Sequence, residues 1–165
     1  MNKNIYFFIT ILILVTIYHE FKVKKTPGTS LNEIVFATSA EYPPFEYQKN
    51  GEIVGFDIDI AHAIAQQLGK KATFKNMTFS SILPALSNMA DAAIATISVT
   101  TNREKNFDFS IPYYYETMAI ISKKGNSLYD QNDLTDIITG CQLATSMEQW
   151  LKQHANKKNI IFFDN

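Results

Sequence analysis

Hydrophobic and polar positions change period several times after residue 30. Short runs rich in β-branched or small apolar residues at 33–38, 72–75 and 91–96 are typical of strands. Residues 57–68 carry apolar side chains on one helical stripe, and Gly69 closes that helix. The stripe consists of Ile60, Ala61, Ile64, Ala65 and Leu68. Because 91–96 is apolar almost throughout, we expect it at the centre of a parallel sheet.

The remaining predicted elements are shorter, and they continue the alternation of strand and helix. They are a hairpin of 45–47 with 53–54 around Asn50 and Gly51, helices from 80 or 81 to 86, at 100–105, 134–138 and 148–154, and strands at 117–122, 141–144 and 160–163. This alternation predicts an α/β fold built on doubly wound sheets.

The N-terminal region has a different character. Residues 5–18 contain no charge and follow Lys3, as in the apolar core of a secretory signal. The run is short for a membrane span, which needs roughly 20 residues. No small-residue cleavage pair follows it, so a cleaved signal and an uncleaved signal-anchor both stay open. Residues 24–32 contain Pro27 and Gly28 and are typical of a linker.

Composition narrows the classes of function. The formal net charge is -1, which argues against nucleic acid as a partner because phosphate binding needs a basic surplus. With 46% apolar and 19% charged residues, the chain is not of the disordered class. One cysteine excludes an internal disulfide and a zinc site built from several cysteines.

Polar groups follow three of the predicted strands. In open α/β sheets, ligands bind beyond the carboxyl ends of the strands. Hydroxyls, an aromatic ring and one guanidinium stand there: Ser39, Tyr42, Thr96, Ser98, Arg103, Thr145 and Ser146. Such a set suits a small anion with an apolar stem. No catalytic triad order, P-loop or dinucleotide fingerprint is present, and we expect neither a cofactor nor a metal.

Five blocks of sequence occur in an order that resembles one known family. They are ATSAEYPPFEY (37–47), GFDIDIAHAIAQQLG (55–69), FSSILPAL (79–86), DAAIATISVTTNREKNFDFSIPYYY (91–115) and CQLATSMEQWL (141–151). Together they resemble the periplasmic solute-binding proteins for polar amino acids, which are receptors of ABC importers. The resemblance covers residues 33–165.

The resemblance implies a type II periplasmic-binding-protein fold, with two α/β lobes that enclose the ligand. Residues 1–30 would be the signal or anchor with its linker, 31–117 the first lobe and 118–165 the start of the second. The first lobe would be nearly complete and the second partial, since each lobe in the family needs roughly 100 residues. A truncated frame, a split gene and a degraded gene all stay open.

The resemblance also assigns roles to particular residues. Arg103 would hold the ligand α-carboxylate, since a guanidinium pairs with a carboxylate through two parallel hydrogen bonds. Ser98 would complete that cradle, and the carbonyl of Ala95 or Thr96 would accept from the α-ammonium. The family's acidic partner for that ammonium would lie beyond Asn165.

Further assignments concern the ligand side chain and the second lobe. Tyr42 and Phe79 would sandwich the side chain, and Ser39 stands where some relatives carry Asp. From the second lobe, the closing segment would contribute Gln142, Thr145 and Ser146. Glu41 and Glu46 are interpreted as loop charges rather than catalytic acids.

The function implied is that of a non-enzymatic receptor. It would be exported to the periplasm, or tethered to the inner membrane through residues 5–18. There it would bind a polar amino acid and present it to an inner-membrane ABC permease. Two alternatives stay open: an enzyme resembling the periplasmic cyclohexadienyl dehydratase, and a membrane-tethered amino-acid sensor domain.

Overall fold

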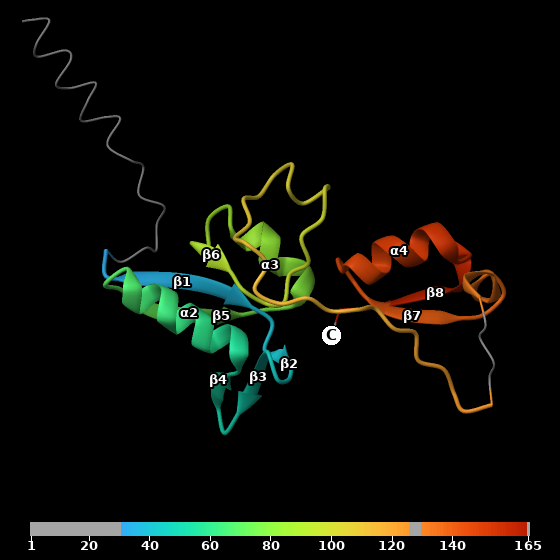
Figure 1. Cartoon of the computed structure of the whole chain (residues 1–165), viewed down its shortest axis with the longest axis horizontal. Helices are drawn as coiled ribbons and strands as arrows, with labels where there is room; N and C mark the ends of the chain where they lie inside the picture. The colour runs from blue at the N-terminus through green and yellow to red at the C-terminus, as the bar shows by residue number, and fades with distance from the viewer. Residues whose placement is uncertain (1–30, 126–129, 165) are drawn as a thin grey trace, which may run out of the picture.

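A computed structural model describes residues 31–125 and 130–164 as two α/β lobes joined by an extended segment (Figure 1). The predicted signal or anchor at 5–18 lies outside the described residues. Among the residues that are described, no helix is long and apolar enough to cross a membrane.

The first lobe is organised around a parallel sheet in the order β5-β1-β6. The strands are β1 (Glu33–Thr38), β5 (Lys71–Asn76) and β6 (Ala92–Ala93). In register, Ile34 faces Ala72 and Phe36 faces Ala92. Because β1 lies between two parallel neighbours, its carboxyl end and that of β6 open at the same edge of the sheet.

A small antiparallel sheet follows β1 in the chain. It contains β2 (Glu41–Tyr42), β3 (Glu46–Lys49) and β4 (Glu52–Val54), in that order. The predicted turn is confirmed: Asn50 and Gly51 have φ values of 54° and 84°. Gly55 then leads into the first helix with φ of 131°, and a Cβ there would lie 2.2 Å from the Phe45 carbonyl oxygen. Only glycine fits that close approach.

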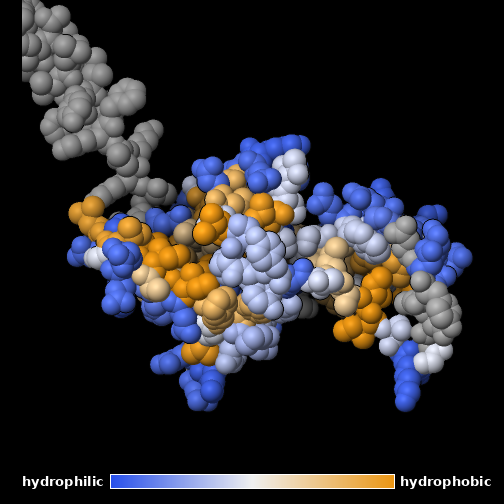
Figure 2. Space-filling model, in the orientation of Figure 1, coloured by the Kyte–Doolittle hydropathy of each residue, from blue (hydrophilic) through white to orange (hydrophobic). Residues whose placement is uncertain are grey.

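Two helices cover this lobe: α2 (Phe56–Gln67) and α3 (Phe79–Ala85). Ala61 and Ala65 are buried as predicted, in one core cluster with Phe36 of the sheet. The outer part of the predicted stripe is not buried, since Ile64 is 44% exposed and Leu68 is 61% exposed. Figure 2 shows hydrophobic side chains gathered over α2.

The second lobe is smaller. Strands β7 (Thr139–Gln142) and β8 (Ile160–Phe163) form a parallel pair, and α4 (Ser146–His154) connects them. Two short 3₁₀ helices complete it, η1 (Gln131–Leu134) and η2 (Lys157–Asn159). Its core consists of Leu134, Leu151 and Ile160.

Four sequence predictions need correction. The strand expected at 91–96 is confined to two residues and lies at an edge of the described sheet rather than at its centre, because β1 is its one neighbour among the described strands; further along, the chain bends and Thr96 has φ of 45°. Residues 100–105 form hydrogen-bonded turns and no helix. The helix expected at 134–138 is replaced by η1. The strand expected at 117–122 is absent, since no described strand offers it a ladder partner.

Candidate functional site

The carboxyl end of β1 places Ser39 beside the small antiparallel sheet. Ser39 is 4% exposed, and its carbonyl accepts a hydrogen bond from the Glu41 amide at 2.8 Å. The next residue, Ala40, donates its amide to Asn76 Oδ1 at 2.8 Å. The turn after β1 is therefore fixed by backbone contacts, with the Ser39 side chain largely enclosed.

The carboxyl end of the neighbouring strand forms a tight turn at Ala95 and Thr96. Ala95 is fully buried, and Thr96 is one of few non-glycine residues in the described chain with positive φ. A β-branched residue in that region is strained, so other contacts must hold it. The Thr96 amide donates to Asp57 Oδ2 at 2.8 Å. This turn sets the direction of the backbone that leads to Ser98.

Arg103 contacts both lobes. Its Nη1 donates to the Ser98 carbonyl at 2.6 Å, and its Nη2 donates to the Ala144 carbonyl of the second lobe at 2.8 Å. The guanidinium also lies over the Phe79 ring, with its central carbon 5.9 Å from the ring centroid. Partial burial lowers the pKa of Arg103, but an arginine stays charged at neutral pH.

The N-terminus of α4 meets the first lobe at the same place. The Ser146 and Ser98 hydroxyl oxygens lie 3.3 Å apart, within hydrogen-bond distance. Thr145 caps α4, because its hydroxyl accepts from the Glu148 amide at 3.2 Å and donates to the Gln142 carbonyl at 2.7 Å. The structure thus brings together Ser98, Arg103 and Ser146, while Thr145 shapes the helix end.

Gln142 faces another part of the second lobe. Its Nε2 donates to the Asp164 carbonyl at 3.4 Å, beyond the end of β8. A direct role for Gln142 in ligand contact therefore stays a prediction.

The two predicted aromatic partners come from different elements. Tyr42, in β2, is 47% exposed and stacks on Phe45 with ring centroids 5.8 Å apart. Burial, followed by the charges of Glu116 and Glu46, raises the pKa of Tyr42. Phe79 begins α3 and is half-buried beneath Arg103. Whether the two rings enclose one ligand side chain stays a prediction.

Sequence analysis missed a buried acidic pair beside this turn. Glu46, interpreted as a loop charge, is 1% exposed, and Asp57 is fully buried. Burial and then the neighbouring Asp57 charge raise the pKa of Glu46 to about 9. Tyr113 donates its hydroxyl to Asp57 Oδ2 at 2.9 Å. The available signal was the position of Glu46 between Phe45 and Tyr47 in a strand, but alternation alone does not say which face is covered.

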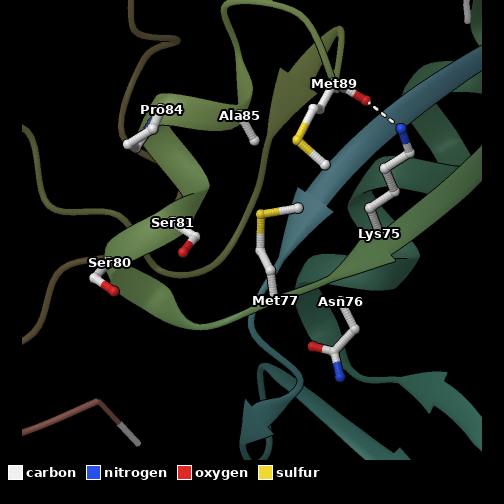
Figure 3. Close-up of a pocket in the computed structure, with 8 residues that line it drawn as sticks. All are labelled: Lys75, Asn76, Met77, Ser80, Ser81, Pro84, Ala85 and Met89. Atoms are coloured by element: carbon white, nitrogen blue, oxygen red, sulfur yellow. Dashed lines mark hydrogen bonds between the residues drawn. The ribbon is translucent and has the colours of Figure 1, made fainter.

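A separate depression of about 600 Å³ lies between the end of β5 and α3 (Figure 3). Its lining includes Met77 and Met89, but no residue of the predicted site. The Lys75 ammonium, the cation in the lining of this depression, already donates a hydrogen bond to the Met89 carbonyl at 2.7 Å. Among the described residues, no group of three or more His, Cys, Asp or Glu side chains could hold a metal ion.

Comparisons with known proteins bear on the family and the fold of this chain. Residues 34–159 match the family model of the bacterial extracellular solute-binding proteins, family 3. An ancestral arginine-binding protein bound to arginine has a solved structure with a TM-score of 0.76 and 41% identity; the match covers 81% of this chain and 62% of that one. This confirms the predicted fold class of a periplasmic binding protein.

Curated relatives give the same result. An arginine-binding extracellular protein of Bacillus subtilis is 36% identical over 71% of this chain and 46% of its own length. An ABC transporter arginine-binding protein of Escherichia coli is 35% identical over 82% of this chain and 56% of its own length. The chain therefore spans about half the length of the curated relatives it matches. It belongs to the bacterial extracellular solute-binding proteins, family 3.

Proposed function

We propose that this chain contributes to an extracytoplasmic receptor that captures a polar amino acid and delivers it to an ABC permease. The observation that carries this proposal is Arg103, whose two terminal nitrogens bond carbonyl groups from both lobes. A ligand carboxylate that entered between the lobes would replace these neutral acceptors with a charged one. Hydrogen bonds to a charged partner are the stronger kind.

The hydroxyls of Ser98 and Ser146 support the same assignment, because they lie on opposite lobes beside the guanidinium. A carboxylate between them would accept from both. Closure of the lobes around a ligand would then be favoured by contacts that the open form lacks.

For the ligand itself we propose a cationic amino acid, with arginine as the first to test. Several relatives carry arginine in their names, and Tyr42 offers a half-exposed aromatic face. An aromatic face attracts a guanidinium through its π electrons.

The test is a thermal-shift and calorimetric screen of the full chain against the twenty amino acids. We expect arginine to give the largest shift, and Arg103→Ala to abolish it. An equal response of wild type and Arg103→Ala would contradict the assignment of the carboxylate cradle.

Export and the permease partner are proposals on different grounds. The charge-free run at 5–18 supports export, and the family is described as extracellular. A reporter enzyme that works only outside the cytoplasm should be active when it is fused after Asn165. Activity of a reporter that works only in the cytoplasm would contradict export.

A further inference from the structure

Thr96 occupies a conformation that its own side chain disfavours. Its φ of 45° falls in the left-handed region, which a β-branched side chain disfavours. Such a conformation persists only when neighbouring groups determine it. Thr96 lies two residues before Ser98, so its conformation sets where the Ser98 carbonyl meets Arg103.

Asp57 is the group that meets the strained backbone. Its Oδ2 accepts from the Thr96 amide at 2.8 Å and from the Tyr113 hydroxyl at 2.9 Å. Asp57 lies in the first turn of α2, and Tyr113 lies in the irregular stretch of chain between β6 and the second lobe. One carboxylate oxygen of Asp57 therefore links the turn at Thr96 to Tyr113.

Glu46 completes the arrangement from β3. Its Oε1 lies 3.4 Å from the Thr96 hydroxyl, which donates to it. Its Oε2 and the Oδ1 of Asp57 are both buried, and neither has a hydrogen-bond partner among the described residues. A proton shared by the two carboxyl groups would satisfy both atoms, because a protonated carboxyl donates and a carboxylate accepts. Asp57 also raises the pKa of Glu46, after burial, which is the larger cause.

The surroundings favour the protonated form of Glu46. The titratable groups that face it are Asp57, Glu116, Tyr42 and Tyr113, and none of them is a cation. The ion pair found among the described residues joins Lys152 and Glu148 in α4, so it does not involve Glu46 or Asp57. Two buried carboxyl groups without a cation retain one proton between them.

We propose that Asp57 and Glu46 are positioning residues that share one proton, hold Thr96 in its left-handed conformation and tether it to Tyr113. The pair is too buried to contact a ligand, so it acts through the backbone that presents Ser98. That the Ser98 backbone serves an amino-acid site rests on the proposed function. The local geometry does not, so the two can fail separately.

The first test needs no ligand. In NMR spectra of the full chain, the Glu46 carboxyl carbon should titrate near pH 9, and in Asp57→Asn its midpoint should fall but stay above the ordinary value, because burial is the larger cause of the shift. The Thr96 amide should exchange with solvent at least tenfold faster in Asp57→Ala than in wild type. Asp59→Ala, an exposed acid on the same helix, is the matched control and should leave the Thr96 amide unchanged.

Milder variants keep the proposal falsifiable if Asp57→Ala fails to fold. Glu46→Gln retains a donor toward Asp57, so its Thr96 amide should stay protected up to pH 10, whereas wild type should lose protection above pH 9. Tyr113→Phe removes only the hydroxyl that bonds Asp57, so the Thr96 amide of this variant should stay protected. A Glu46 midpoint near its ordinary value, or equal Thr96 exchange in Asp57→Asn, Glu46→Gln and wild type at pH 10, would overturn the proposal.

Binding supplies the functional arm. Asp57→Ala should weaken arginine binding at least tenfold, and Asp57→Asn, which keeps an acceptor oxygen, should recover part of that loss. If wild type binds no amino acid while the NMR results hold, the proposed function fails and the positioning of Thr96 stands. If arginine binds and Asp57→Ala binds it as tightly as wild type, the positioning role is refuted.

Discussion

Replacing Arg103 by lysine separates charge from geometry in the proposed carboxylate cradle. Arg103 uses two different terminal nitrogens, one on the Ser98 carbonyl at 2.6 Å and one on the Ala144 carbonyl at 2.8 Å. The two acceptors belong to different lobes. Lysine keeps the positive charge but has a single nitrogen on a flexible stem, so it cannot reproduce the planar fork.

The expected loss of arginine affinity follows from the number of hydrogen bonds that the guanidinium makes and the usual strength of each. Arg103→Lys should lose one of two charge-assisted hydrogen bonds, each of which contributes about 1.5–3 kcal/mol. A tenfold change in affinity corresponds to about 1.4 kcal/mol, so arginine binding should weaken roughly ten- to a hundredfold. Arg103→Ala should weaken arginine binding further than Arg103→Lys, because it also removes the second hydrogen bond and leaves the ligand carboxylate without a cation.

Isothermal titration calorimetry of arginine into the full-length variants is the assay. Lys105→Ala is the control, because it removes one positive charge from an exposed position in the same turn. It should bind within twofold of wild type. Binding by Arg103→Lys within twofold of wild type, or an equal loss in Lys105→Ala, would refute the argument that the guanidinium fork holds the carboxylate.

Three further predictions concern stability, pH and chemistry. Gly55→Ala should destabilise the fold by more than about 1 kcal/mol in chemical denaturation, because its Cβ would meet the Phe45 carbonyl at 2.2 Å; an unchanged midpoint would contradict that contact. The free energy of unfolding of wild type should fall as pH rises from 4.5 towards 9. The pKa of Glu46 is raised to about 9 in the folded chain, so over this range Glu46 keeps a proton when folded and loses it when unfolded. Glu46→Gln should remove that part of the pH dependence in thermal melts between pH 5 and 9, and parallel curves for the two proteins would count against it. Incubation with prephenate should release no phenylpyruvate, and release above the buffer rate would favour the enzymatic alternative.

Local periodicity was enough to predict most of the helices and strands. Residues 57–68 carry small apolar side chains at helical spacing, and the structure buries Ala61 and Ala65 in α2. The strand at 160–163 agrees in both bounds. In such segments the chain itself decides the local structure, so sequence reasoning succeeds.

The failures come from contacts between distant residues. Residues 117–122 have strand composition, but a strand forms only where another strand pairs with it, and the described residues offer none. Glu46 stands in a short hairpin strand whose alternation does not say which face is covered, and the Thr96 turn, distant in the chain, lies against it. The strain at Thr96 is likewise invisible in sequence, because it depends on Asp57, which is 39 residues away in the chain.

If the strand-end groups bind an amino acid, a thermal melt of wild type with and without arginine will show it. At a hundredfold excess over Kd, binding adds about 2.7 kcal/mol of stability. This should raise Tm by roughly 10 °C for a chain of this size. We expect such a saturable shift with arginine and its loss in Arg103→Ala. No saturable shift with any of the twenty amino acids would contradict it.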